Sequence, residues 1–233
     1  MGLGFPSGVA PGFDQNHVAA SGVRFSGISQ GGGFVNVLNG KAGTSVGPPG
    51  TSISGVIGRG SVFTSATNNA FNFAGMQTTN DNTFTIGGIL TYTTFGGFNS
   101  WFSTSSDATH GVAIGSNGST PSNILFNFNG STNAGSSNIL VTNIPYFLIF
   151  SASLSAQSYI IKNLANGQIT VLSSSTVCTY AGGAPNGTFQ VGNDGTTLGA
   201  GATVAAVMYS NQKMLAPQLL QWTEDPWGFW YPQ

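Results

Sequence analysis

The chain has 233 residues, of which only 5% are charged, and its formal net charge is −1. No basic stripe is present to neutralise phosphates, so we expect neither nucleic acid nor an anionic membrane as a partner. The 40% hydrophobic content, with 17 Phe, excludes a disordered chain, and abundant Gly, Ser, Thr and Asn favour short strands over helices.

Residues 1–50 differ in composition from the rest of the chain. Gly and Pro recur there, and hydrophobic periodicity is weak apart from residues 34–38. This composition predicts an extended N-terminal arm or loosely attached segment over residues 1–50, followed by one β domain over residues 51–233. We expect an adjacent subunit to hold the arm, with Phe5 and Phe13 in the contact. The first residues lack the pattern of a secretory signal, which predicts synthesis in the host cytoplasm without export.

From about residue 60 onward, short β-type runs alternate with turn residues. Phe84, Ile86, Leu90 and Tyr92 alternate with small or polar residues, the period-two pattern of a half-buried strand. Asn-Gly pairs suit hairpin turns: Asn39-Gly40 is one candidate, and Asn166-Gly167 lies between two β-type runs. Roughly a dozen strands at this spacing predict an all-β, two-sheet antiparallel jelly-roll sandwich. The further strand candidates are residues 101–104, 112–114, 124–128, 139–141, 146–154, 158–164, 168–172, 189–191 and 203–209.

The C-terminal region contains one credible helix. Pro217 stands where a first helical turn accepts proline. Leu215, Leu219 and Trp222 would then share one face of that helix. We therefore expect a single short C-terminal helix packed on the sandwich.

Five aromatic residues follow one another closely at the C-terminus. Large aromatic side chains dominate interface energetics, and they also stack on sugar rings. The alternative is that they fold back and seal the open edge of the sandwich. We expect Trp222 and Trp227 to seal the sandwich, and Phe229, Trp230 and Tyr231 to contact another chain.

The order of several segments resembles laminin-G-like, concanavalin A-like domains over about residues 60–230. The segments are NTFTIGGIL at 82–90, SWFS at 100–103, GVAIG at 111–115, PYFLIF at 145–150 and a hairpin at 159–169. The ending at 215–227 resembles the short helix and terminal Pro-Trp of many phage and bacterial members. One departure is Gly87-Gly88, where a Trp-bearing position is usual, and a second is the sparseness of the family's acidic residues.

The resemblance implies a jelly roll of the kind found in lectins, glucanases and many virion surface proteins. The phage-like ending then points to a virion structural or decoration protein. This step is an analogy, because a fold does not fix function.

Glycoside hydrolysis is the enzymatic activity that the resemblance raises. It normally uses two carboxylates across the scissile bond, and glucanases of this kind supply them from an E-x-D-x-x-E strand. That motif is absent, since Glu224 is the only glutamate and it adjoins Asp225. We therefore predict that the chain is not an enzyme, and a pair of acids facing each other across a cleft would overturn this. The other acids are isolated in sequence: Asp14, Asp81, Asp107 and Asp194.

Metal, nucleophile and cofactor chemistry find little support. Asp81 and Asp194 lie in Asn- and Gly-rich segments that suit calcium, but turn formation explains both segments and is preferred. Two histidines, His17 and His110, are too few for a zinc site. His110 and Asp107 could form a local hydrogen-bonded pair, but an ordinary surface loop is the preferred interpretation. No cofactor is expected. The serine hydrolase motif G-x-S-x-G occurs twice, at Ser29 and Ser45, but neither match is followed by a helix, so we attribute both to chance. Cys178 and Trp101 are assigned to the core.

Two functions from different classes follow. The first is a non-catalytic structural protein of a phage particle, such as a capsid decoration or other particle-surface protein, located in the virion. Its partners would be copies of itself in a homo-oligomer and other virion proteins. The alternative is a lectin-like module that binds a glycan for cell-surface attachment. An exposed aromatic beside Asn or Asp would favour the lectin, whereas an N-terminal segment packed on its own body would argue against the first function.

Overall fold

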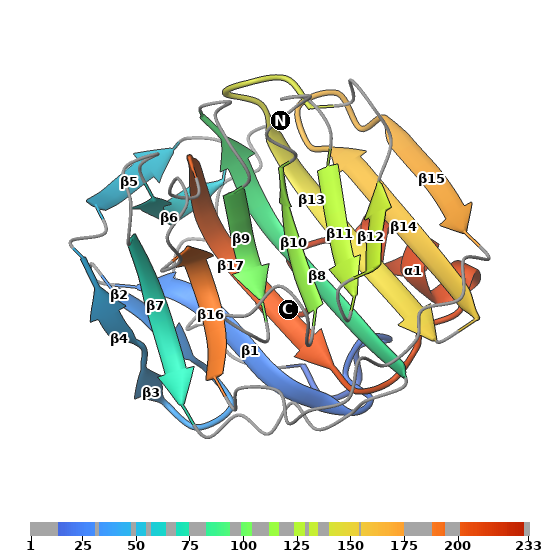
Figure 1. Ribbon diagram of the computed structural model, residues 1–233, viewed down its shortest axis with the longest axis horizontal. Coiled ribbons are helices and arrows are strands. Elements are labelled where there is room, and N and C mark those ends of the chain that lie inside the picture. The colour runs from blue at the N-terminus through green and yellow to red at the C-terminus, as the bar shows by residue number, and fades with distance from the viewer. Residues whose placement is uncertain are drawn as a thin grey trace.

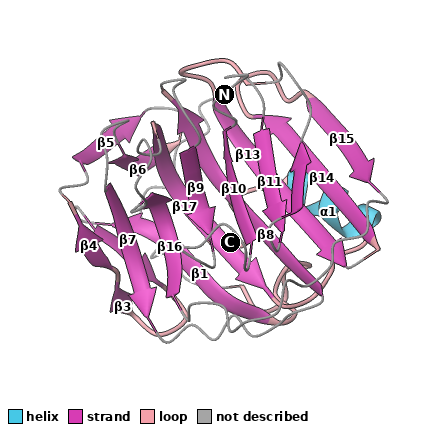
Figure 2. Ribbon diagram, in the orientation of Figure 1, coloured by secondary structure: helices cyan, strands magenta, loops and turns pink. Residues whose placement is uncertain are grey.

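Two antiparallel sheets lie face to face, and one short helix covers part of the outer face of the larger sheet (Figures 1 and 2). This architecture is that of the computed structural model, and it confirms the predicted all-β sandwich with a C-terminal helix. The structure describes residues 14–30, 33–47, 50–54, 57–63, 69–74, 83–93, 99–103, 112–116, 124–128, 131–134, 140–153, 155–174, 188–193 and 201–230.

Within the described ranges, the larger sheet has ten strands. They are β1 (Val23–Gln30), β2 (Gly33–Asn36), β3 (Lys41–Ala42), β5 (Gly50–Ser54), β6 (Gly58–Phe63), β8 (Thr83–Tyr92), β13 (Pro145–Ser153), β14 (Ala156–Asn163), β15 (Ile169–Ser174) and β17 (Ala202–Ser210). The order is β15-β14-β13-β8-β17-β1-β2-β3, with β6 pairing β17 and β5 pairing β6.

The smaller sheet has seven strands and lies in front of the larger one in Figure 1. They are β4 (Thr44–Val46), β7 (Asn69–Ala74), β9 (Asn99–Ser103), β10 (Val112–Ser116), β11 (Ile124–Phe128), β12 (Ser131–Ala134) and β16 (Thr188–Asn193). The order is β12-β11-β10-β9-β16-β7-β4.

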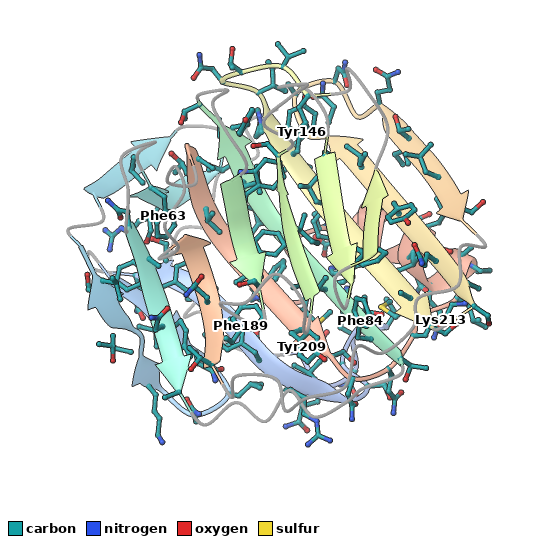
Figure 3. The ribbon with its side chains drawn as sticks, viewed as in Figure 1. Phe63, Phe84, Tyr146, Phe189, Tyr209 and Lys213 are labelled. Carbon is teal, nitrogen blue, oxygen red and sulfur yellow. The ribbon has the colours of Figure 1, made fainter. Side chains whose placement is uncertain are left out.

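The main core fills the space between the sheets. Phe84, Ile86, Leu90 and Tyr92 of β8 are all fully buried in it, which confirms the predicted inward face of this strand. Aromatic rings from both sheets meet there, and Phe25 of β1 stacks on Phe189 of β16 with ring centroids 4.2 Å apart. Figure 3 shows side chains such as Phe84, Phe189 and Tyr209 in this layer. Burying this much aromatic surface is the main source of stability for the sandwich.

A second core lies on the outer face of the larger sheet. Ile89 of β8 and Phe147 of β13 point to this side, where they meet Trp222 of helix α1 (Ala216–Glu224). Strand β8 is therefore buried on both faces, rather than half-buried as its alternation predicts. Gly87 makes the approach of the helix feasible, because a Cβ at this position would lie 3.2 Å from the Trp222 ring.

A bulge in β9 brings two consecutive aromatic residues into the main core. Ile114 pairs with Phe102 and Gly115 pairs with Ser100, so Trp101 is the extra residue. Trp101 and Phe102 are both fully buried in the main core, which confirms the core assignment of Trp101. A regular strand would have placed these neighbours on opposite faces.

The expectation of a loose arm over residues 1–50 does not hold for residues 23–46, which form four strands of the two sheets. Strand β1 lies between β17 and β2, and Phe25 and Phe34 are fully buried in the main core. Residues 14–22 also pack on the body, since Ser210 Oγ donates to the Ser21 carbonyl over 2.6 Å. Hydrophobic burial thus overrides the Gly- and Pro-rich composition. Residues 1–13 lie outside the described residues.

Two predicted hairpin turns are confirmed, and the helix is confirmed with one change. Gly40 and Gly167 adopt φ values of +69° and +78° in the turns β2–β3 and β14–β15. Pro217 lies in the first turn of α1 as predicted. Leu215, however, is extended and 63% exposed at the N-cap, so it does not share the buried face of Leu219 and Trp222. No described helix is long and apolar enough to span a bilayer.

Candidate functional site

A row of mostly polar residues crosses the outer face of the seven-stranded sheet. The register pairs Thr44 with Asn72, Asn72 with Gln190 and Gln190 with Ser103. The backbone register continues from Ser103 to Ala113, Asn127 and Thr132 on β10, β11 and β12. We call the first four positions, Thr44, Asn72, Gln190 and Ser103, the polar row.

The outward direction of the polar row follows from its neighbours. Phe71 and Phe73 flank Asn72, Phe189 and Val191 flank Gln190, and all four belong to the main core between the sheets. Because successive side chains of a strand alternate between faces, Asn72 and Gln190 point away from that core.

Two members of the polar row make a defined contact, and one lacks a partner. Gln190 Nε2 donates to Asn72 Oδ1 over 3.0 Å. Gln190 is 3% exposed and Ser103 is 2% exposed. Within the described part of the chain, Ser103 Oγ is one of the buried side-chain oxygens without a hydrogen-bond partner. Amides and hydroxyls both donate and accept hydrogen bonds. Thr44 is exposed and Asn72 is half-buried, so these two members can bind a ligand rich in hydroxyl groups, whereas Gln190 and Ser103 are buried in this conformation.

The predicted partner-contact residues separate into two groups. Phe5, Phe13 and Tyr231 lie outside the described residues. Phe229 and Trp230 are fully buried in the second core, where each ring lies near Trp222, with centroids 5.6 and 6.0 Å away.

The burial of Phe229 and Trp230 differs from the expected contact with another chain. They continue the sealing that was expected of Trp222 and Trp227, which are buried in the same cluster. Burial of four aromatic rings is more favourable than exposing them at the end of the chain. In this conformation their side chains offer no surface to a partner.

His17 joins the N-terminal segment to the C-terminal tail. Its ring makes edge contacts with Trp222 and Phe229, with centroids 5.8 and 5.5 Å apart, and Asp14 N donates to the Phe229 carbonyl over 3.1 Å. Ala19 N donates to Nδ1 of His17. Burial lowers the pKa of His17 below its ordinary 6.5, although the carboxylates of Asp14 and Asp225 act in the opposite direction.

The carboxylates in the described part of the chain have structural partners or are exposed. Asp14 Oδ1 accepts a hydrogen bond from Asn16 N over 2.8 Å, and Asp225 Oδ1 accepts one from Gly228 N over 2.9 Å. Glu224 is exposed. The described residues contain no group of three His, Cys, Asp or Glu side chains that could hold a metal. The other residues weighed for catalysis or calcium lie outside the described ranges: Asp81, Asp107, His110, Cys178 and Asp194.

The two G-x-S-x-G serines lie in settings that do not resemble a nucleophile elbow. Ser29 is buried in β1, and its Oγ lies 2.9 Å from Ser61 Oγ. Ser45 belongs to β4, and its Oγ donates to the Gly47 carbonyl over 2.6 Å. Neither strand leads into a described helix, whereas the elbow requires a strand followed by a helix.

Sequence reasoning did not find the polar row. Its members lie in strands that are distant in sequence, so only the pairing register places them side by side across the sheet. The available signal was the alternation Phe71, Asn72, Phe73 and Phe189, Gln190, Val191, which predicts polar side chains on one face of each strand. In contrast, every large hydrophobic residue that is exposed among the described residues is aliphatic, so the exposed aromatic expected of a lectin site is not found there.

No protein-family model matches the chain, and no curated protein matches it by sequence. Solved structures share its fold. A Trypanosoma rangeli sialidase in complex with 2,3-difluorosialic acid aligns with a TM-score of 0.61 and 11% identity, covering 89% of this chain and 34% of the sialidase.

Two further solved structures align over most of the chain. The enzymatically active domain of tailspike protein 2 from bacteriophage CBA120 gives a TM-score of 0.52 and 12% identity, covering 94% of this chain and 32% of that chain. An arabinofuranosidase complexed with arabinofuranosyl-α-1,2-xylobiose gives a TM-score of 0.54 and 14% identity, covering 79% of this chain and 43% of the arabinofuranosidase. The chain thus spans about a third of the sialidase and of the tailspike domain, and less than half of the arabinofuranosidase. The likeness defines the class of fold, a two-sheet antiparallel sandwich.

These comparisons contradict the prediction that the chain is not an enzyme, because solved structures that share its fold include a sialidase and an arabinofuranosidase. The prediction failed because it rested on a count of acids and on one motif. Two of six acids suffice for a carboxylate pair, and sialidases use a tyrosine nucleophile instead of a second carboxylate. The described tyrosines are buried: Tyr92, Tyr146, Tyr159 and Tyr209.

Proposed function

We propose that this chain is a surface protein of a phage particle, and that its seven-stranded sheet binds a glycan of the host surface through the polar row. The observation that carries the proposal is the alignment of uncharged hydrogen-bonding residues across four neighbouring strands of one sheet, β4, β7, β16 and β9. The fold shared with a bacteriophage tailspike domain and with two kinds of glycan-directed enzyme supports the same ligand class.

The composition of the chain supports a neutral ligand. With 5% charged residues and a net charge of −1, the protein has little means to attract a strongly charged partner. A sugar polymer presents many hydroxyls, and the amide and hydroxyl side chains of the polar row can satisfy them as donors and acceptors. We also propose membership of the laminin-G-like, concanavalin A-like domains, which the order of the sequence motifs supports.

The N-terminal strands weaken the hypothesis that the chain is a purely structural protein of the particle. An arm that grips a neighbour was the main argument for a purely structural role, but residues 23–46 are used within the chain's own sheets. Contact with other virion proteins therefore needs another surface. This change favours the glycan-binding function over a decoration role that depends on the arm.

Cleavage of the bound glycan is a second candidate function. It is favoured by the enzymes that share the fold, which include sialidases and an arabinofuranosidase. Asp14 and Asp225 cap turns, so Asp81, Asp107 and Asp194 are the carboxylates to test first.

Screening on a glycan array, followed by calorimetric titration with a selected glycan, tests the proposed function. We expect Thr44→Ala and Asn72→Ala each to weaken binding about tenfold, the equivalent of roughly 1.4 kcal/mol for a lost hydrogen-bonding group. Gln168→Ala, at an exposed position in the β14–β15 hairpin, is the matched control and should bind as the unmodified chain does.

Two results would contradict the proposal: no glycan bound by a folded chain, or binding that Thr44→Ala and Asn72→Ala leave unchanged. Release of reducing sugar is followed in the same samples. Cleavage that disappears in Asp81→Asn, Asp107→Asn or Asp194→Asn, while binding persists, would establish the second function and identify its carboxylate.

A further inference from the structure

Among the described residues, the edge strands of the two sheets differ in how well they are protected against pairing with another chain. In natural sheets, an edge strand is protected from pairing with another chain when it is short or contains Lys, Pro or a bulge. Strand β3 has two residues and includes exposed Lys41. Strands β4 and β12 have three and four residues, and β5 starts directly after Pro48-Pro49. Strand β15 has six residues and contains neither a charge nor a proline.

Within the described ranges β15 pairs with β14 alone, and its backbone has groups that point away from that strand. Asn163 N donates to the Gln168 carbonyl over 2.8 Å, so these two residues form a hydrogen-bonded pair at the hairpin. Hydrogen-bonded and non-hydrogen-bonded pairs alternate along an antiparallel ladder. The register therefore places Ile169, Val171 and Ser173 in non-hydrogen-bonded pairs, and their N–H and C=O groups face the free edge.

The side chains at this edge are exposed and apolar. Ile169 is 41% exposed and Val171 is 51% exposed. Both point to the helix side of the sheet, because Val171 lies opposite Ile160, a residue of the second core. Ile169 lies opposite Lys162, whose Nζ donates to the Thr223 carbonyl in the last turn of α1. The only nearby charge in this strand pair is thus engaged with the helix end.

We propose that two copies of this chain associate through β15, antiparallel to each other, with the two-fold axis at Val171. Val171 would then pair with its own copy, and Ile169 would pair with Ser173 of the partner subunit. All three outward-facing residues would form hydrogen-bonded pairs, and the two ten-stranded sheets would become continuous.

The absence of charged residues in β15 makes a second copy of the chain a suitable partner for this strand. At a two-fold axis each residue meets its own image, so a charged residue in the strand would face a like charge. Strand β15 contains none, and the net charge of −1 opposes self-association very little. One strand pairing is a small interface, so we expect an equilibrium that depends on protein concentration.

Sedimentation analysis over a range of protein concentrations tests this proposal. We expect the unmodified chain to dimerise, and Val171→Lys and Val171→Glu each to be monomeric, because like charges would meet at the axis. An equimolar mixture of the two variants should dimerise again, because opposite charges would then meet. Leu38→Lys introduces the same charge at an exposed residue beyond β2, near the opposite end of the sheet, and should dimerise as the unmodified chain does.

Hydrogen exchange on the unmodified chain provides a test that needs no variant. The amides of Ile169, Val171 and Ser173 should be protected more strongly at high than at low protein concentration. A chain that stays monomeric at high concentration would overturn the proposal. So would dimerisation unaffected by Val171→Lys, a mixture that fails to restore it, or amides at this edge whose exchange ignores concentration.

Discussion

Gly87 and Gly88 show how single residues shape this sandwich. They depart from the pattern of the laminin-G-like domains that the sequence resembles, in which a Trp-bearing position is usual. On the outer face, Gly87 leaves room for the Trp222 ring, and on the inner face a Cβ at Gly88 would meet Phe102 at 3.1 Å and the Ala206 carbonyl at 2.7 Å. The tryptophan that occupies the outer face of β8 is thus supplied by α1, and the small residues of the strand are needed for its approach.

His17 is the residue whose ionisation is most clearly tied to the fold. Burial lowers its pKa, so the unfolded chain binds more protons than the folded chain in the window below pH 6.5. The contribution of neutral His17 is fully present above about pH 6.5 and is lost as the pH falls toward its depressed pKa.

We therefore expect the free energy of unfolding to decrease on acidification through this window, and His17→Phe to reduce that decrease. Urea denaturation at several pH values between about 5 and 8 measures it. Phe retains a ring against Trp222 and Phe229 but cannot ionise. His110→Phe is the control with the other histidine. An equal pH dependence in His17→Phe and the unmodified chain would contradict this assignment.

At the scale of elements, α1 and the tail after it cover the outer face of the larger sheet and form part of the second core. The linker to the helix is fixed by buried hydroxyls, since Met214 N lies 2.8 Å from Ser151 Oγ and Thr85 Oγ1 donates to the Gln212 carbonyl over 2.7 Å. Trp222 then packs on Phe147 with a centroid distance of 5.0 Å. These contacts bury one face of the larger sheet, which would otherwise present Ile89 and Phe147 to water.

Trp222→Ala should destabilise the protein by about 3–5 kcal/mol, because it removes a fully buried ring and leaves a cavity over β8. The shift in the denaturation midpoint at constant slope measures the change. Leu220→Ala, on the exposed side of the same helix, should change stability by about 0.5 kcal/mol or less. Similar losses for the two variants would show that the helix contributes through its own propensity rather than by covering the sheet.

At the scale of the whole molecule, the N-terminal strand β1 lies inside the larger sheet. The larger sheet runs through β17, β1 and β2, so β1 connects segments from opposite ends of the chain. Removal of β1 would expose the side of β17 and uncover Phe189, on which Phe25 stacks. The domain boundary expected near residue 50 therefore does not separate an independent sandwich.

Deletion of residues 1–30 should abolish cooperative unfolding, because it removes a central strand with Phe25 and Ile28. Thermal unfolding followed by circular dichroism measures this loss. Deletion of residues 1–13 removes no described element and should leave a cooperative transition. A cooperative transition after the larger deletion would restore the interpretation of residues 1–50 as an arm.

The two proposals concern different faces of the molecule. The polar row lies on the seven-stranded sheet, whereas β15 is an edge of the ten-stranded sheet. A two-fold axis through paired β15 strands would direct both seven-stranded sheets to the same side. Two glycan sites presented in this way would bind a repetitive surface with avidity.

The sequence determined the features that depend on neighbouring residues. Alternation in residues 84–92 specified the core face of β8, Asn-Gly pairs specified the turns at Gly40 and Gly167, and Pro217 specified the start of α1. Only the tertiary structure decided that Gly- and Pro-rich residues 23–46 join the sheets, that Phe229 and Trp230 are buried, and that Asn72, Gln190 and Ser103 share one level. The physical reason is that burial and cross-strand register depend on residues far apart in the chain, about which local propensity carries no information.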